Sequence, residues 1–198
     1  MKKARLEAFS DGVLAIIITI MVLEIKVPHG THFSDLKELI PIFLSYALSF
    51  LYIGIYWNNH HHMISTVRKV TGNILWANLH LLFWLSLVPF ATGWVGENHF
   101  SAAPLALYGV ILLMAGIAYV ILQSLIIKNE GKDCVLKKAI GKDVKGKISP
   151  FLYLAAIALS WVNTVCAGLI YLIAALIWLI PDRRIERILH EETATSNE

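Results

Sequence analysis

The sequence predicts an all-α, polytopic membrane protein with six transmembrane helices. Of its 198 residues, 57% are hydrophobic and only 16% are charged, whereas soluble domains carry about 25% charged residues. Uncharged runs cover residues 39–57 and 101–127, and about 20 apolar residues are enough to cross a ~30 Å bilayer core as a helix. This composition is typical of a protein that crosses the membrane several times.

The predicted spans follow the apolar runs of the chain in order. They cover residues 5–27, 35–57, 71–95, 101–127, 148–163 and 164–181, which form one transmembrane domain over 1–182 with a tail over 183–198. The first run is not a cleavable signal peptide, because Asp11 interrupts the apolar region that such a peptide needs. It ends before Pro28, because a proline disfavours helix in the residue before it. Residues 34–38 have the sequence pattern of a helix N-cap at the start of the second span.

The later spans rest on separate observations. Pro89 predicts a kink in the third span, because proline lacks the N–H that the helix requires. Small residues in the fourth span favour close helix contacts. The last apolar block covers 148–180, and as one helix it would be about 50 Å long, well over the hydrocarbon thickness. Two short helices that break near Asn163 are therefore predicted.

The basic residues favour six spans with both termini in the cytoplasm. In this arrangement, all 17 Lys and Arg residues except Lys26 and Lys37 lie on the cytoplasmic side, as the positive-inside rule requires. Five spans would place the arginines of 183–187 on the wrong side. The lysines of 128–147 are better explained by this rule and by anionic lipid head groups than by nucleic acid, so membrane lipids are expected partners and nucleic acid is not.

One face of the first span combines a glycine, branched aliphatics and a hydroxyl. Gly12, Ile16, Thr19 and Leu23 share this face, at spacings of i, i+4, i+7 and i+11. Asp11 is the first residue of the neighbouring face. A carboxylate at mid-depth in a bilayer costs about 2.5–3.5 kcal/mol, so this residue has by default a functional or bundle-forming role. The pattern is typical of a pore lining or a helix contact.

The spacing of several residues matches a known family. Arg5, Phe9, Ser10 and Asp11 fit a first-helix signature, R-x-x-x-F-S-D, and weaker matches follow at Ala15, Ile16, Thr19, Leu23, Trp57, His61, Asn78, Leu82 and residues 89–92. The sequence resembles the transmembrane protein 175 family of potassium channels, found in endolysosomes and in prokaryotes. One copy of the pattern covers essentially the whole chain. It is therefore similar to the single-repeat prokaryotic form rather than to the two-repeat animal form.

The resemblance implies a homotetrameric, potassium-preferring cation channel in a prokaryotic plasma membrane, with a pore lined by the first helix. It places the hydrophobic constriction at Ile16 and Leu23, and further pore-lining residues at Gly12, Thr19 and Ile20. Potassium, with other monovalent cations, would be the permeant ion, and no cofactor is expected. The sequence lacks a carbonyl selectivity-filter loop, so an isoleucine neck would restrict ions and gate by dewetting. Thr19 would offer the best partial coordination.

Two interpretations of Asp11 stay open. It could be a structural acid held by donors on neighbouring helices, because buried charges persist only when they are paired. It could instead attract cations or sense protons at the inner mouth of the pore. The expected network of the inner mouth or between helices consists of Arg5, Phe9, Ser10, Asp11, Trp57, His61, Trp76, Asn78 and His80.

Three other functions compete with a channel. A proton-coupled secondary transporter would use Asp11 as its carrier acid, although such proteins usually show internal repeats and broken midplane helices, which are not evident. A membrane metalloenzyme would use His60, His61 and His62, but adjacent histidines point in different directions on a helix, whereas ligands need i, i+3 or i, i+4 spacing. We therefore expect no metal site and no enzyme. A purely structural membrane protein is the third alternative.

Overall fold

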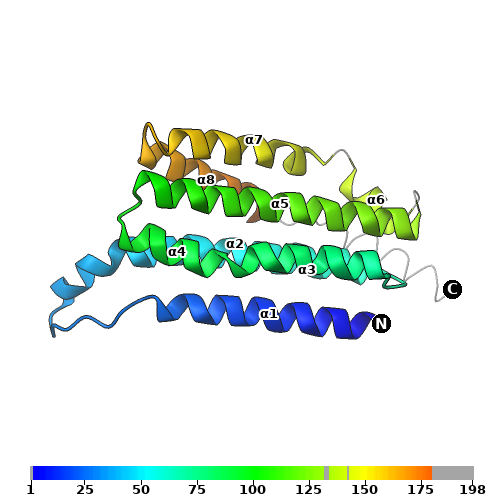
Figure 1. The fold of residues 1–198 in the computed structure, drawn as a ribbon, viewed down its shortest axis with the longest axis horizontal. Coiled ribbons are helices and arrows are strands. Elements are labelled where there is room, and N and C mark those ends of the chain that lie inside the picture. The colour runs from blue at the N-terminus through cyan, green and yellow to red at the C-terminus, as the bar shows by residue number, and fades with distance from the viewer. Residues whose placement is uncertain (1, 132–133, 142, 180–198) are drawn as a thin grey trace.

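The fold is an elongated bundle of helices that run along its long axis (Figure 1). The computed structural model describes residues 2–131, 134–141 and 143–179, and every regular element in these ranges is helical. The elements are α1 (Lys3–Leu23), the 3-10 helix η1 (Phe33–Leu39), α2 (Ile40–Ser65), α3 (Gly72–Ser86), α4 (Val88–Glu97), α5 (Ala102–Glu130), α6 (Val135–Ile140), α7 (Val144–Leu159) and α8 (Thr164–Leu179). The all-α prediction is confirmed.

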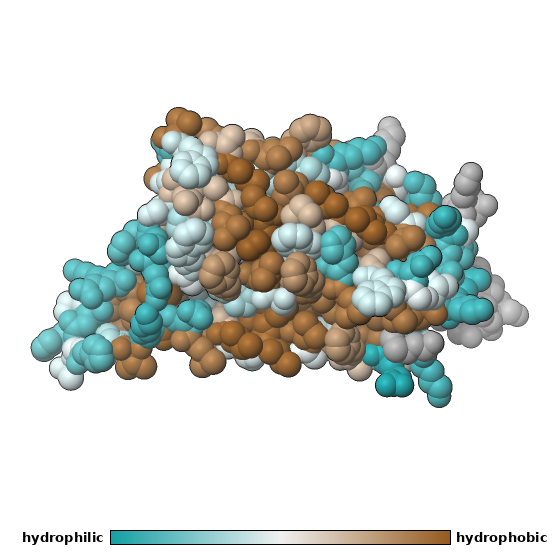
Figure 2. Space-filling model, in the orientation of Figure 1, coloured by the Kyte–Doolittle hydropathy of each residue, from teal (hydrophilic) through white to brown (hydrophobic). Residues whose placement is uncertain are grey.

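Several of these helices have the length and composition of membrane spans. Within the described residues, four segments are long and apolar enough to cross a membrane, namely Lys3–Leu23, Phe33–Ser65, Gly72–Glu97 and Ala102–Glu130. Thr164–Leu179 is a shorter apolar helix. Hydrophobic residues cover much of the middle of the molecule in Figure 2, and hydrophilic residues gather toward its two ends. This distribution is the one that a bilayer requires.

Helix α1 lies along one edge of the bundle. Its main contacts are with α2, α3 and α4, whereas α5 lies between the α3–α4 layer and α7 (Figure 1). Helix α8 packs against α7 and α2. The first helix therefore has neighbours on one side only, and its other side remains open in the single chain.

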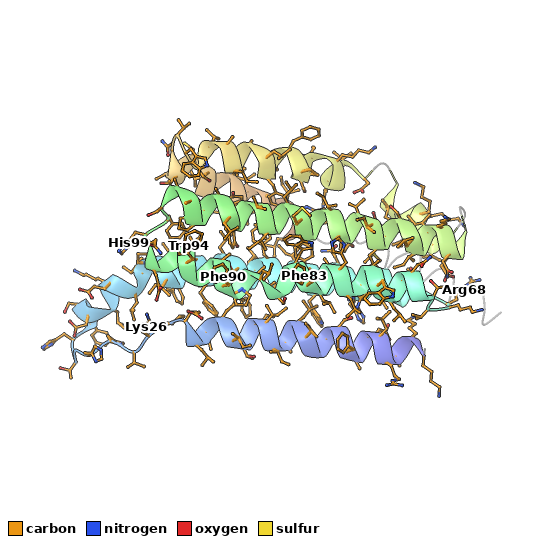
Figure 3. All side chains as sticks on the ribbon, in the orientation of Figure 1. Lys26, Arg68, Phe83, Phe90, Trp94 and His99 are labelled. Atoms are coloured by element: carbon orange, nitrogen blue, oxygen red, sulfur yellow. The ribbon has the colours of Figure 1, made fainter. Side chains whose placement is uncertain are left out.

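Most basic residues lie at one end of the bundle, which we call the basic end. The start of α1, the loop 66–71, the end of α5 and helix α6 meet there, whereas the loops 24–32, 98–101 and 160–163 lie at the opposite end (Figure 1). Figure 3 shows Arg68 at the basic end and Lys26 at the opposite end. This arrangement agrees with the charge distribution used to predict the topology.

Several helix ends differ from the predicted bounds, including those of the fifth span, which is α7 at Val144–Leu159 rather than 148–163. Helix α1 ends at Leu23, before residue 27, because the N–H groups of Glu24 and Ile25 turn back to carbonyls three residues earlier. Helix α2 starts at Ile40 and continues to Ser65, beyond residue 57. Its polar last turns remain helical because their side chains find partners within the protein.

The later helices are interrupted at two places. The third predicted span consists of α3 and α4, which are separated at Leu87, with Pro89 in the first turn of α4. Proline favours this position because its missing N–H is not needed there. The last apolar block is two helices, with residues 160–163 between α7 and α8.

Helices α2 and α4 approach each other closely at Gly96. A Cβ atom on this glycine would lie 2.7 Å from the Cα atom of Ile42 and 2.6 Å from the Ser45 hydroxyl. We expect Gly96→Ala to lower the free energy of unfolding by about 1–3 kcal/mol, because a backbone atom has to move. Gly54→Ala, where a Cβ meets nothing within 4 Å, is the matched control and should not destabilise. Thermal unfolding of both variants in detergent measures the difference, and equal midpoints would refute the close approach.

Candidate pore helix and its hydrogen-bond network

One face of α1 is buried in the bundle. Leu6, Ser10, Leu14, Ile17 and Met21 are all buried, at intervals of three or four residues. This spacing brings their side chains onto one stripe of the helix. The stripe packs against α2, α3 and α4, and it anchors α1 to the rest of the chain.

The residues predicted to line a pore lie on the opposite face. Gly12, Ile16, Thr19, Ile20 and Leu23 are all exposed in the single chain. The exposed fraction is 58% for Ile16 and 76% for Leu23. Such an apolar face, running along most of a membrane-length helix, is covered in the membrane either by lipid or by other protein chains.

Thr19 is the hydroxyl-bearing residue of this exposed face. Its Oγ1 atom donates to the carbonyl oxygens of Ala15 and Ile16, at 3.0 and 2.9 Å. The proton of the hydroxyl is therefore turned toward the helix backbone. The oxygen lone pairs remain available on the exposed side, where a cation could use them.

A buried hydrogen-bond chain joins α1, α2 and α3. The Ser10 hydroxyl donates to the carbonyl of Leu6 at 2.9 Å and accepts from Asn78 Nδ2 at 2.9 Å. The Asn78 side-chain oxygen lies 2.7 Å from His60 Nε2, and because an amide oxygen can only accept, the imidazole N–H donates. The three side chains are 2% exposed or less. We call Ser10, Asn78 and His60 the buried triad.

The buried triad contains only two of the residues that we predicted for the network. Sequence reasoning chose His61, but the histidine that reaches Asn78 is His60. A signal for His60 exists, because it follows the buried Ile53 by seven residues and precedes the buried Ile64 by four, which places all three on one helix face.

Asp11 lies beside the buried triad but outside it. Its carboxylate accepts a hydrogen bond of 3.0 Å from the indole of Trp57, and the Trp57 ring stacks on His61 with centroids 6.3 Å apart. Trp57 and His61 are exposed, and Asp11 is partly exposed. The acid therefore has a donor on α2 and also remains accessible, in the half of α1 that starts at the basic end.

The structure does not bring the other predicted network residues to this site. Arg5 is exposed, and Phe9 is 52% exposed on the open side of α1. Trp76 is 75% exposed on α3. His80 accepts a hydrogen bond from Trp84 of its own helix, at 3.0 Å.

An ion pair ties the opposite end of α1 to α4. Lys26 Nζ lies 2.6 Å from Glu97 Oε1, and both side chains are exposed. The hydrogen bond and the negative charge of Glu97 raise the pKa of the Lys26 amine above its ordinary value of 10.5. Exposed pairs contribute little to stability, so this pair orients the loop after α1 more than it stabilises the fold.

The histidine run is not arranged as a metal centre. Among the described residues, no group of three or more His, Cys, Asp or Glu side chains could hold a metal ion. His60 lies in the buried triad, and His61 is exposed beside Trp57. His60 and His61 therefore lie in different surroundings and do not converge on one metal ion.

Comparison with known proteins identifies the family of this chain. The family model of the endosomal/lysosomal potassium channel TMEM175 matches residues 5–89. A potassium channel of Chryseobacterium sp. (strain P1-3) is 58% identical over 191 residues, which cover 96% of this chain and 100% of that relative. This chain belongs to the TMEM175 family. The resemblance noted in the sequence is confirmed, and the TMEM175 family is one of ion channels rather than enzymes.

Two further TMEM175 proteins place the chain within the family. The crystal structure of a lysosomal potassium-selective channel TMEM175 homologue from Chamaesiphon minutus matches with a TM-score of 0.77 and 31% identity. The match covers 91% of this chain and 97% of that one. The endosomal/lysosomal proton channel TMEM175 of Gallus gallus is 36% identical over 103 residues, which are 46% of this chain but only 21% of the chicken protein.

Proposed function

We propose that this chain forms a potassium-preferring cation channel, with a pore made by the α1 helices of four copies around one axis. The observation that carries the proposal is the exposed apolar face of α1, opposite its buried stripe. One helix supplies one wall, so a closed pore needs several copies, and cyclic symmetry provides them. The bacterial relatives named as potassium channels support potassium as the permeant ion.

The proposed pore restricts ions by hydrophobicity rather than by carbonyl coordination. Ile16 forms the main neck, Leu23 a second constriction near the opposite end of α1, and Gly12 and Ile20 complete the lining. An apolar neck cannot replace the hydration shell of an ion, and it closes by dewetting. Potassium loses water more readily than sodium, so the neck favours potassium modestly. The outward lone pairs of Thr19 offer partial coordination one turn away.

The proposed topology has six spans and both termini in the cytoplasm of a prokaryotic cell. Helices α7 and α8 have 16 residues each, so each is about 24 Å long. They supply the fifth and sixth spans if the bilayer thins slightly around them, at a modest cost. The basic end then lies on the cytoplasmic side. The predicted tail, 183–198, lies outside the described residues.

Asp11 fits a place at the inner mouth of this pore. It lies in the half of α1 that starts at the basic end, is partly exposed and is held by Trp57, so it can raise the local concentration of cations. The transporter alternative has less support, because α1 is one continuous helix from Lys3 to Leu23. Transporter sites usually lie between half-helices near the midplane.

Cysteine accessibility tests which face of α1 lines the pore. The native Cys134 and Cys166 are first replaced by serine, and Ile16→Cys and Ile17→Cys are compared in potassium-loaded liposomes. Ile16 is 58% exposed, whereas its neighbour Ile17 is 4% exposed. A cationic methanethiosulfonate reagent should reduce potassium flux about tenfold or more for Ile16→Cys, because it places a charge in the neck. It should leave Ile17→Cys unchanged.

Two results would contradict the proposal. Equal sensitivity of the two cysteine variants would mean that the exposed face of α1 does not line the ion path. If chemical cross-linking in liposomes yielded dimers but no tetramers, a pore made by four copies would be ruled out. Sodium and N-methylglucamine serve as the comparison cations. A potassium flux that saturates and requires a proton gradient would favour the transporter.

A further inference from the structure

A second feature, remote from α1, is a cavity between α2, α5, α7 and α8. Its volume is about 300 Å³, which is the lower end of the range for small-molecule sites, roughly 300–1,000 Å³. It lies between the middle of the bundle and the basic end, and none of its described lining residues comes from α1, α3 or α4. The cavity is therefore separate from the proposed pore.

The wall of the cavity combines aromatic and aliphatic side chains. Its aromatic side chains are Tyr52, Tyr56, Tyr119, Tyr153 and Trp178. Several of their polar atoms are already bonded within the protein. The indole of Trp178 donates to Ser149 at 2.7 Å, and the hydroxyl of Tyr119 donates to the carbonyl of Asn59 at 3.4 Å.

Tyr52 completes this arrangement. Its hydroxyl donates to the carbonyl of Tyr171 at 2.6 Å, outward from the cavity, because Tyr171 is not part of the lining. The wall thus presents mainly ring surfaces and aliphatic carbons to the space inside. An occupant needs an apolar body to fill such a space favourably.

One charged group stands at the end of this apolar space. Asp143 is the only ionisable acid or base, tyrosines aside, among the described lining residues. Its carboxylate caps α7 by accepting from the N–H of Gly146 at 3.0 Å, and its backbone is left-handed, with φ 43°. The cap fixes the position of the carboxylate at the cavity wall.

We propose that this cavity binds an organic ammonium ion that carries an apolar body. The apolar body packs among the aromatic rings, and the ammonium group pairs with the Asp143 carboxylate. A cation next to tyrosine and tryptophan faces gains cation–π attraction as well as the ion pair. An anionic lipid fits less well, because the described wall offers no lysine or arginine and its one charge is negative.

The charge requirement is tested with radiolabelled 4-phenylbutylamine and its neutral analogue 4-phenylbutanol. Binding is measured by scintillation proximity on the full chain in phosphatidylcholine nanodiscs, with empty nanodiscs as the blank. Asp143→Asn removes the charge and keeps a side chain that caps helices and tolerates the left-handed backbone. The variant should bind the amine at least about tenfold more weakly, while binding of the alcohol stays the same. Equal amine affinity in both proteins would overturn the proposal.

The location is tested with a residue that fills the cavity. A Cβ atom on Gly116 would have only ordinary contacts, 3.8 Å from the Tyr56 hydroxyl and 3.9 Å from the Tyr153 ring. Gly116→Leu should therefore fold, occupy the space and abolish binding of both probes. Gly54→Leu, at a glycine outside the lining with nothing within 4 Å, is the matched control and should bind both. Retained binding in a folded Gly116→Leu protein would exclude this cavity as the site.

Discussion

Replacing Asn78 with leucine is expected to lower the free energy of unfolding by about 2–4 kcal/mol. The substitution removes both hydrogen bonds of the amide, one to Ser10 and one to His60. Ser10 keeps its bond to the Leu6 carbonyl, but the Nε2 N–H of His60 is left in an apolar interior. An unsatisfied buried group carries its full desolvation cost. Titration of the purified protein with a denaturing detergent measures the loss.

A control on the same helix separates this loss from a general effect of leucine. Asn73 is exposed in the first turn of α3, so Asn73→Leu should change stability by no more than about 0.5 kcal/mol. The double variant Ser10→Ala with Asn78→Leu should lose less than the sum of the two single changes, because both break the same hydrogen bond. Equal losses for Asn73→Leu and Asn78→Leu, or strict additivity, would mean that the buried triad does not hold the helices together.

The helical fold could be predicted because the bilayer imposes a simple pattern on the sequence. Long uncharged runs and the positions of the lysines are sufficient to place most helices, since a membrane requires them. The helix ends were less accurate. Asn58, Asn59 and the histidines after them resemble the end of a span, yet the helix continues to Ser65. Asn59 bonds to the carbonyl of Ile55 and His60 to Asn78, and these tertiary and local partners are not visible in composition.

The buried triad was predicted in part for a related reason. Ser10 and Asn78 stand out because each is a polar residue inside an apolar run. His60 and His61 are chemically the same and adjacent, so only the rotation of α2 decides which one is buried. The same applies to α1, where apolar residues occur all round the helix and Ile16 is exposed whereas Ile17 is buried. Hydrophobicity alone cannot orient such a helix; the packing against α2, α3 and α4 does.

Replacing Ile16 with asparagine is expected to raise potassium flux and to bring the potassium-to-sodium flux ratio close to that of the free ions. The proposed neck excludes water because its walls are apolar, and polar amides let it stay hydrated. A gain of about tenfold in flux corresponds to a barrier lowered by about 1.4 kcal/mol, which is a moderate change for rewetting one constriction. Fluorescent flux assays in liposomes, with potassium, sodium and N-methylglucamine in turn, measure both quantities.

The matched control is Leu154→Asn, because Leu154 is 53% exposed on α7, away from the proposed pore. It introduces the same polar group into an exposed apolar position and should leave flux and selectivity unchanged. If the wild type is silent and Ile16→Asn conducts, the neck is correctly placed and the resting channel is closed there. If neither conducts while both remain tetrameric, the pore assignment is wrong. An equal rise in potassium flux for Leu154→Asn would contradict the proposed pore. A polar residue on α7 would then act as strongly as one on the exposed face of α1, as expected for leakage along the boundary between protein and lipid.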